Sequence, residues 1–218
     1  MLRLTLLAGL ALAAASSFAT VFDAYNDFSI SNNPNGVWRY GYSNTLGGAF
    51  VPLTVNTPGN PDAWLDPFIA SLGVYHTTPG FLIGTVSSPP NQMILHPGPN
   101  AQYAVLRFVA PGTGVFNFTA GFFGVDFVGP TTTDVHILQN NAVIGNGAIN
   151  TFATSPSIIF GGPVSLNTGD TLDVAVGFGG NSYLFDSTAV NYRIEGVPEP
   201  VTLVGLGGLA LLARRRRR

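Results

Sequence analysis

The sequence predicts an all-β fold, a β-sandwich or jelly roll, with helices only at the two ends of the chain. Short segments such as 103–109 and 115–120 alternate apolar with polar side chains or run briefly apolar, which is typical of strands. The chain also contains 27 glycines and 16 prolines among 218 residues, and this frequency disfavours long helices through most of its length. A chain of this length is large enough to bury one hydrophobic core.

Two turns fit this fold. Asn140 and Asn141 both tolerate positive φ, and they predict a tight β-hairpin turn after a strand at 134–138. The Gly-Asp pair at 169–170 predicts a second turn that leads into a strand at 171–177. Turns of this kind between short strands are typical of antiparallel sandwiches.

Residues 1–19 have the pattern of a secretory signal peptide. Arg3 supplies a positive start, 4–15 form an apolar run of 12 residues, and small residues precede a cleavage site between Ala19 and Thr20. The alternatives are a buried N-terminal helix and a membrane anchor, but a membrane span needs about 20 apolar residues. We therefore expect a signal helix that the secretion translocon recognises and that is removed on export.

Residues 196–218 combine three features in a fixed order. Pro198, Glu199 and Pro200 come first, and the prolines resist helix formation. The apolar run 201–213 follows, and its 13 residues would form a helix of about 20 Å, short of the roughly 30 Å hydrocarbon core. The sequence thus predicts a short C-terminal transmembrane helix. It ends in a cationic cluster that we expect to act as a cytoplasmic stop, namely Arg214, Arg215, Arg216, Arg217 and Arg218.

This tail resembles the PEP-CTERM sorting signal of Gram-negative bacteria in its Pro-Glu-Pro motif, its Gly/Leu-rich span and its arginine cluster. The resemblance covers 197–218 and implies recognition by an exosortase, an integral-membrane transpeptidase-like enzyme, with cleavage near the Pro-Glu-Pro. It also implies export across the inner membrane, transient anchoring there, and a final place in the cell envelope or outside the cell, in bacteria that make exopolysaccharide and biofilm matrix. An ordinary tail anchor is the alternative, and a span this short would be weakly held.

The exported domain, residues 20–195, is acidic. It carries Arg39, Arg107 and Arg193 against ten carboxylates, a net charge of −7, and the whole chain lacks lysine and cysteine. This composition excludes a broad basic face for nucleic acid, disulfide frameworks and thiolate metal sites. Because an acidic surface repels anions, a neutral polysaccharide is a better ligand candidate than an acidic one.

From 96 to 195 the order of elements resembles a carbohydrate-binding-like jelly-roll module of exported bacterial proteins. Such modules occur in proteins with many roles, so the fold alone does not define the function. The segments that carry the resemblance are 96–100, 107–112, 133–136, 169–170 and 185–188.

Four aromatic side chains have two interpretations. Trp38, Tyr40 and Tyr42 fall on one face of a segment with period two, and Trp64 follows downstream. Flat aromatic rings can stack on sugar rings, so this stripe is a candidate sugar platform. The alternative, which we favour, is that the stripe forms one wall of the sandwich core, which needs large apolar groups.

Few patterns in the chain point to catalysis or to a metal. The three histidines lack the spacing of a metal site, and no glycine-rich phosphate loop or G-x-S-x-G nucleophile elbow occurs. Two pairs of carboxylates remain, Asp170 with Asp173 and Asp62 with Asp66, although an aspartate at a Gly-Asp turn typically bonds the local backbone. We expect no catalytic residue, no metal site and no cofactor. Calcium, held by aspartates and loop carbonyls, is the alternative.

These features together predict an exported, exosortase-sorted, non-catalytic protein of the cell envelope or extracellular matrix, associated with polysaccharide. The alternative is a secreted polysaccharide-active enzyme, a glycoside hydrolase or lyase, with a carboxylate pair. The two differ in geometry, because an enzyme needs two acidic groups that face a common cleft.

Overall fold

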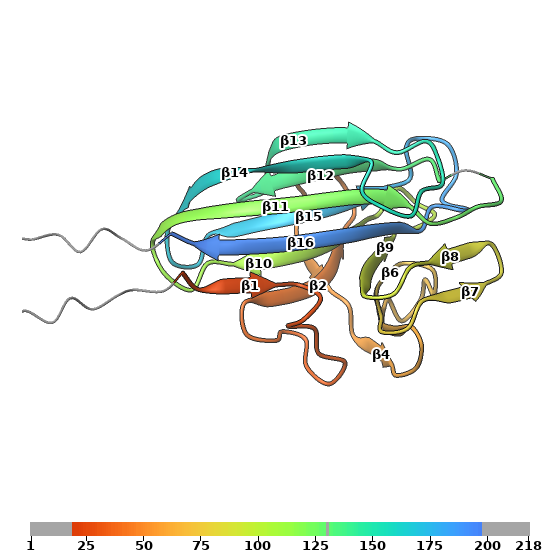
Figure 1. The fold of residues 1–218 in the computed structure, drawn as a ribbon, viewed down its shortest axis with the longest axis horizontal. Helices are drawn as coiled ribbons and strands as arrows, with labels where there is room; N and C mark the ends of the chain where they lie inside the picture. The colour runs from red at the N-terminus through yellow and green to blue at the C-terminus, as the bar shows by residue number, and fades with distance from the viewer. Residues whose placement is uncertain (1–18, 130, 198–218) are drawn as a thin grey trace, which may run out of the picture. The chain divides into compact units, whose positions relative to one another are not determined.

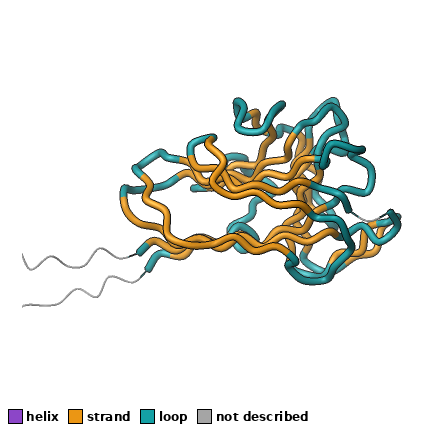
Figure 2. The backbone as a smooth tube through the Cα atoms, turned by 90° about the horizontal axis from the view of Figure 1, so that it is seen from above, coloured by secondary structure: helices purple, strands orange, loops and turns teal. Residues whose placement is uncertain are grey.

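A computed structural model describes residues 19–129 and 131–197, which form strands, turns and loops without a helix. The strands build two antiparallel sheets that lie as two layers (Figure 1, Figure 2). The eight-stranded sheet has the order β14 (Ile158–Leu166), β11 (Gly114–Gly124), β16 (Thr188–Gly196), β9 (Gln92–His96), β6 (Gly73–Thr77), β5 (Asp62–Leu65) and β4 (Val55–Thr57), with β1 (Val21–Asp23) also beside β16. The six-stranded sheet has the order β13 (Ala142–Ala148), β12 (Asp134–Gln139), β15 (Thr171–Gly177), β10 (Tyr103–Val109), β2 (Trp38–Ser43) and β3 (Val51–Pro52). The predicted all-β sandwich is confirmed.

The path of the chain is that of a jelly roll. From β9 onward, successive strands cross from one sheet to the other at every connection except the one between β12 and β13. That connection is the predicted hairpin. Asn140 and Asn141 have φ angles of 49° and 67°, and Gln139 pairs directly with Ala142. Two consecutive residues with positive φ match the twist of the flanking strands, which is why asparagine suits both positions.

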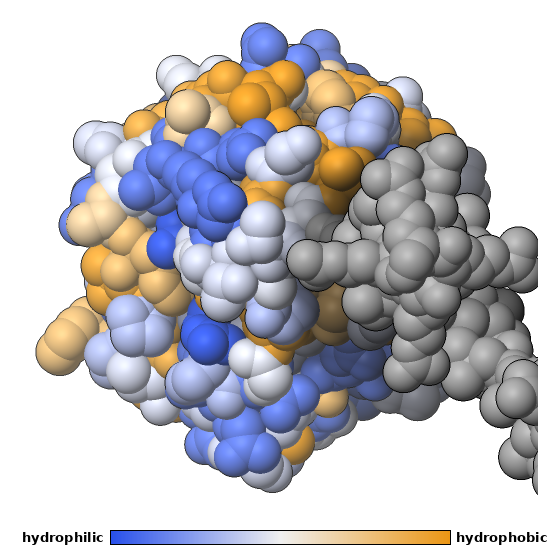
Figure 3. Space-filling model, turned by 90° about the vertical axis from the view of Figure 1, so that its left-hand side faces the viewer, coloured by the Kyte–Doolittle hydropathy of each residue, from blue (hydrophilic) through white to orange (hydrophobic). Residues whose placement is uncertain are grey.

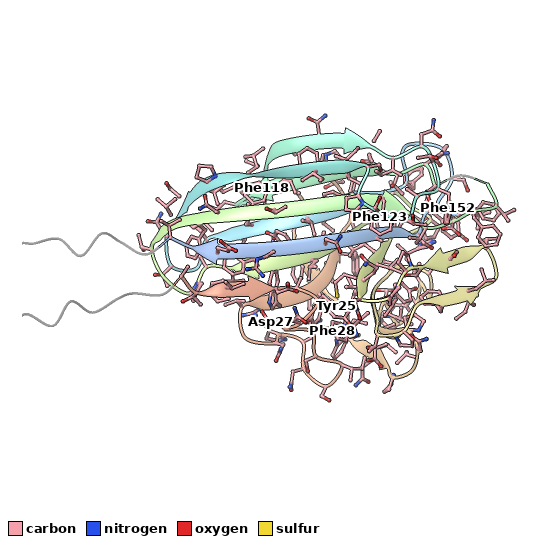
Figure 4. The ribbon with its side chains drawn as sticks, viewed as in Figure 1. Tyr25, Asp27, Phe28, Phe118, Phe123 and Phe152 are labelled. Atoms are coloured by element: carbon pink, nitrogen blue, oxygen red, sulfur yellow. The ribbon has the colours of Figure 1, made fainter. Side chains whose placement is uncertain are left out.

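The core lies between the two sheets. Phe116, Phe118 and Phe122 occupy alternate positions of β11 and are buried against side chains of the other sheet (Figure 4 labels Phe118). The ring of Phe116 lies 5.8 Å from that of Phe108 on β10, in an edge-to-face arrangement. Because successive side chains of a strand alternate between faces, a period-two sequence places its large apolar groups in this layer.

A second apolar cluster lies on the outer face of the eight-stranded sheet. Ile94 on β9 and Phe123 on β11 are buried there, although their neighbours in sequence point into the core. A small hairpin outside both sheets, β7 (Phe81–Ile83) and β8 (Val86–Ser88), packs on this cluster through Phe81 and Val86. The hairpin therefore adds a third layer over one part of the sheet.

The two ends of the domain lie side by side. Gly196 N donates a hydrogen bond to Thr20 O at 2.8 Å, and Val197 N donates one to Val115 O at 2.9 Å. In Figure 1 these ends lie at the left, whereas β7, β8 and most long loops lie at the right. Figure 3 views the left-hand end, where hydrophobic and hydrophilic residues are interspersed.

The helices predicted at the two termini lie outside the described residues, apart from Ala19, which is exposed beside Thr20. The same is true of the Pro-Glu-Pro motif and of the arginine cluster. Within the described part of the chain, no helix is long and apolar enough to cross a membrane.

Candidate functional site

The structure places the aromatic stripe in a wall of the core, where Trp38 and Tyr40 offer no exposed ring face to a sugar, while Trp64 lines a separate open pocket beside Pro34 and Leu53. Trp38, Tyr40 and Trp64 are at most 6% exposed, and Tyr42 is half-buried against the edge of the same core. Polar atoms of Trp64 and Tyr40 are hydrogen-bonded inside the protein. Trp64 Nε1 donates to Ser29 O at 2.8 Å, and the Tyr40 hydroxyl accepts a hydrogen bond from Ser29 N at 3.3 Å. Burial raises the pKa of Tyr40 to about 12. Period two shows that the rings share one face of β2, and that face points inward.

The first pair of carboxylates does not face a cleft. Asp170 Oδ2 accepts a hydrogen bond from Asn167 N at 2.7 Å, which closes the turn before β15. Asp173 is 2% exposed and is bonded by both the Nε and an Nη of Arg107, at 2.9 and 2.7 Å. The guanidinium also lies 4.5 Å from the centre of the Phe50 ring. This buried ion pair, which has no local sequence signature, joins β10 to β15.

The carboxylates of the second pair, Asp62 and Asp66, also bond to backbone groups that are close to them in the sequence. Asp62 accepts a hydrogen bond from Gly59 N at 2.8 Å and lies 3.9 Å from His76 Nδ1. Asp66 Oδ1 accepts hydrogen bonds from two backbone N–H groups of the turn that follows, both at 2.9 Å. Each carboxylate therefore holds backbone of its own segment, as aspartates in turns commonly do.

His76 and His136 occupy structural positions. The His76 ring is stacked between those of Tyr25 and Phe28, with centroids 4.5 and 4.6 Å away, and burial lowers its pKa (Figure 4 labels Tyr25 and Phe28). His136 Nε2 lies 2.8 Å from the Asp134 carboxylate. In residues 19–129 and 131–197, no group of three His, Asp or Glu side chains is placed to hold a metal ion.

The candidate site is a pocket of about 460 Å³ on the outer face of the eight-stranded sheet, under the β7–β8 hairpin. Its volume lies within the range of roughly 300–1,000 Å³ that is usual for small-molecule sites. The β7–β8 hairpin, whose residues line the pocket, lies at the right of Figure 1, away from the two ends of the domain. Its apolar lining comes from the sheet, the hairpin and the loop before β16, and includes Tyr75, Phe81, Ile83, Ile94, Leu184 and Phe185.

A few polar groups lie among these apolar side chains. Asp126 is 1% exposed, and its carboxylate accepts hydrogen bonds from Thr85 Oγ1 and Ser187 N, both at 2.8 Å. A backbone bridge between Asp126 and Val86 ties this residue to the hairpin. The pocket therefore has a buried acidic group at a fixed position, bonded from two of its walls.

His96 is a second polar group of the pocket. Its Nδ1 lies 2.9 Å from Pro97 O, and because a carbonyl can only accept, Nδ1 carries the proton of the neutral ring. Burial lowers the pKa of His96 more than the Pro97 hydrogen bond and the Asp126 charge raise it, so the ring is neutral at pH 7. The other nitrogen, Nε2, makes no hydrogen bond within the described residues and is free to accept one from a ligand.

Ser187, His96 and Asp126 do not form a catalytic triad, although they line the same pocket. The His96 Nδ1 proton goes to the Pro97 carbonyl, whereas a triad histidine would give it to the aspartate. Asp126 instead accepts its hydrogen bond from the backbone N–H of Ser187.

Asp186 lies directly beside the pocket and is fully buried. Its Oδ1 accepts hydrogen bonds from Thr132 N and Oγ1, at 3.0 and 3.3 Å, while Oδ2 has no partner among the described residues. Burial raises the pKa of Asp186 to about 7, the two Thr132 hydrogen bonds lower it, and the charges of Asp126 and Asp134 raise it further. The loop that carries Leu184 and Phe185 is thus held by a carboxyl group that titrates near neutral pH.

The rim of the pocket is apolar and exposed. Leu184 is 55% exposed and Ile83 is 55% exposed, from opposite walls. Phe185 has a φ of 64°, a conformation that is rare for a bulky side chain and that clusters at functional sites. A Cβ added at Gly129 would lie 3.1 Å from the Phe185 ring, a tight contact, and the φ of 72° at this position also favours glycine.

Sequence reasoning missed the pocket as a site, although it singled out two of its segments. His96 begins one of the segments that carry the resemblance to carbohydrate-binding-like modules, and 185–188 is another. The structure brings them together with Asp126, for which the sequence holds no signal. The signal-cleavage residues Ala19 and Thr20 are both exposed and do not line this pocket.

No protein-family model matches the chain, and no curated protein sequence matches it. Solved structures with a similar arrangement include a CBM51 module from Clostridium perfringens in complex with methyl-galactose, at 16% identity and a TM-score of 0.37 over 66% of this chain and 94% of that one. They also include a family 35 carbohydrate-binding module from Clostridium thermocellum, at 11% identity and 0.33 over 82% and 98%. Rabbit GITRL, at 14% identity, matches with a TM-score of 0.30 over 44% of this chain and 74% of that one. Similarity of this size assigns neither a family nor a ligand to this chain.

Proposed function

We propose that this chain is an exported, non-catalytic binding protein of the cell envelope or extracellular matrix, and that the pocket under the β7–β8 hairpin binds a sugar unit of an extracellular polysaccharide. The observation that carries the proposal is the pocket itself, which combines an apolar, aromatic lining with a few fixed polar groups. Sugar rings have the same two-sided character, because their C–H faces pack on apolar surfaces and their hydroxyls hydrogen-bond.

The charges of the domain restrict the sugar. Among the described residues, neither lysine nor arginine lines the pocket, and Asp126 lies in it. An anionic sugar would therefore meet repulsion without a compensating cation. We expect a sugar unit without carboxylate, sulfate or phosphate groups.

Delivery to the envelope rests on the two chain ends, which lie outside the described residues. We propose removal of the signal peptide between Ala19 and Thr20 by the export machinery, and recognition of Pro198, Glu199 and Pro200 by an exosortase. The domain is complete before this motif begins, because Val197 N already bonds to β11. Processing near the motif would leave the pocket at the far end of the domain from the point of attachment.

The test of binding uses a glycan array of neutral, amino and acidic polysaccharide fragments, with the full chain in mild detergent and with and without calcium. Leu184→Ala, on the exposed rim, should weaken binding about tenfold, since it removes about 1.5 kcal/mol of apolar contact. Ile159→Ala is the matched control, because Ile159 is 65% exposed on β14 and does not line the pocket. Binding to no glycan, or equal losses in both variants, would contradict the proposal.

A further inference from the structure

Three hydrogen-bonding groups of the pocket can only accept, whereas the hydroxyls of Ser71 and Ser187, which also line it, can donate or accept. The Asp126 carboxylate can only accept, and the neutral His96 ring presents Nε2 as an acceptor because Nδ1 is turned to Pro97 O. The Thr85 hydroxyl donates its hydrogen bond to Asp126, so the Thr85 oxygen can only accept a hydrogen bond from a ligand. A ligand that bonds to the Asp126, His96 and Thr85 groups must bring donors.

No cationic side chain of the described domain neutralises these acceptors. The chain has no lysine, and the three arginines of residues 20–195 have other partners. Arg107 is paired with Asp173, and Arg193 with Glu195. Arg39 donates to backbone carbonyls beside β2. Among the described residues, no cationic side chain therefore pairs with the buried Asp126 carboxylate, and a positive charge on a ligand would be attracted to it.

We propose that the pocket selects a sugar unit with a free ammonium group, such as a de-N-acetylated hexosamine, and that Asp126 and His96 determine this preference. The inference rests on the proposed function, since it names the class of sugar for the same pocket. The C–H face of the ring packs against the apolar walls, and the ammonium group donates to His96 Nε2 within the field of the Asp126 carboxylate. A hydrogen bond to a charged group is worth enough to give roughly a tenfold to hundredfold preference over an uncharged sugar.

The geometry explains why an acetylated or plain sugar would bind less well. An acetamido or hydroxyl group brings a donor but no charge, so the buried carboxylate stays unneutralised. The apolar walls contribute equally to all three sugars, because they contact the ring rather than the substituent. The preference and the overall affinity therefore depend on different residues of the pocket.

The experiment is isothermal titration of the full chain in mild detergent with three tetramers, of glucosamine, of N-acetylglucosamine and of glucose. It is run at about pH 6.5, where a sugar amine is mostly protonated. We expect the glucosamine tetramer to bind at least tenfold more tightly than the other two, and Asp126→Asn to abolish this preference. Asp170→Asn, which removes an exposed carboxylate outside the pocket, controls for the general negative charge and should keep the preference.

Two measurements keep the proposal testable if Asp126→Asn does not fold. The wild-type chain alone reports the preference, and Leu184→Ala should weaken all three tetramers by the same factor while the preference stays. Equal binding of the three tetramers by the wild-type chain would overturn this inference and leave the proposed function standing. A preference that persists in a folded Asp126→Asn variant would overturn the assignment to Asp126. Binding of none of the tetramers, together with a blank glycan array, would overturn the proposed function itself.

Discussion

Asp186 should make the domain less stable at neutral pH than at mildly acidic pH. Its pKa is about 7 in the folded protein, against 3.8 for an ordinary aspartate, chiefly because the group is buried. The folded state therefore holds a proton between about pH 4 and pH 7 that the unfolded state has already released. The stabilisation that protonated Asp186 contributes is therefore fully present below about pH 4 and is lost as the pH rises to about 7. A difference of about three pKa units corresponds to at most about 4 kcal/mol.

The perturbation is Asp186→Asn, which replaces the carboxyl group with a neutral group of nearly the same size. The amide oxygen can still accept the hydrogen bonds from Thr132. We expect the variant to be about 2–4 kcal/mol more stable than the wild type at pH 8, and nearly equal to it at pH 4.5. The assay is urea unfolding of the full chain over this pH range. His76 and His96 are present in both proteins, so the difference between the two curves reports the Asp186 carboxyl group together with its coupling to Asp126 and Asp134.

Asp170→Asn is the control with the opposite sign. The pKa of Asp170 is lowered, first by the hydrogen bond from Asn167 N, so this carboxylate stabilises the domain above pH 4 and loses that effect as the pH falls. The variant should therefore be less stable than the wild type at neutral pH. The reasoning is refuted if Asp186→Asn is no more stable than the wild type at pH 8, or if its advantage does not shrink on acidification.

Two further predictions concern the buried ion pair and catalysis. Arg107→Ala should lower the free energy of unfolding by about 3–5 kcal/mol, because it leaves Asp173 buried without its partner, and urea unfolding that shows a loss below 1 kcal/mol would contradict this. We also expect no release of reducing ends from common polysaccharides, since neither carboxylate pair named from the sequence faces a cleft. Turnover that disappears in a folded Asp173→Asn or Asp170→Asn variant would overturn the non-catalytic assignment.

The features of the fold that the sequence predicts are those that depend on neighbouring residues. The strands predicted at 103–109, from its apolar pattern, and at 171–177, from the Gly-Asp turn before it, match β10 and β15 to the residue. The Asn140-Asn141 turn is likewise local, because positive φ at two adjacent residues depends on their own side chains. Such patterns need no knowledge of which strands pair.

The site could not be predicted in the same way because it is built from distant segments. Ile94, Asp126 and Phe185 line one pocket, yet more than 30 residues separate each from the next. Period two also leaves open which face of a strand is inside, so the Trp38 stripe suited a sugar platform as well as a core wall. Only the pairing of β2 with β10 decides between them, since it turns that stripe toward the other sheet.

The tail motif gives the remaining prediction. Glu199→Ala should block exosortase-dependent sorting and leave the domain folded, because β16 ends at Gly196 and the hydrogen bonds described for Gly196 and Val197 precede residue 199. Glu195→Ala is the matched control. It removes a nearby carboxylate that lies within β16 and pairs with Arg193 on the surface, where an ion pair contributes little.

The measurement is the mass and cellular location of the protein in a host with and without its exosortase. The wild type and Glu195→Ala should lose the residues beyond the Pro-Glu-Pro only where the enzyme is present, and Glu199→Ala should keep them in both hosts. If Arg214 to Arg218 stay attached to the wild-type protein in both hosts, the sorting proposal is wrong, whatever the pocket binds. The two proposals are independent in this respect, because the pocket is lined by residues between 61 and 187, all of which precede the tail motif.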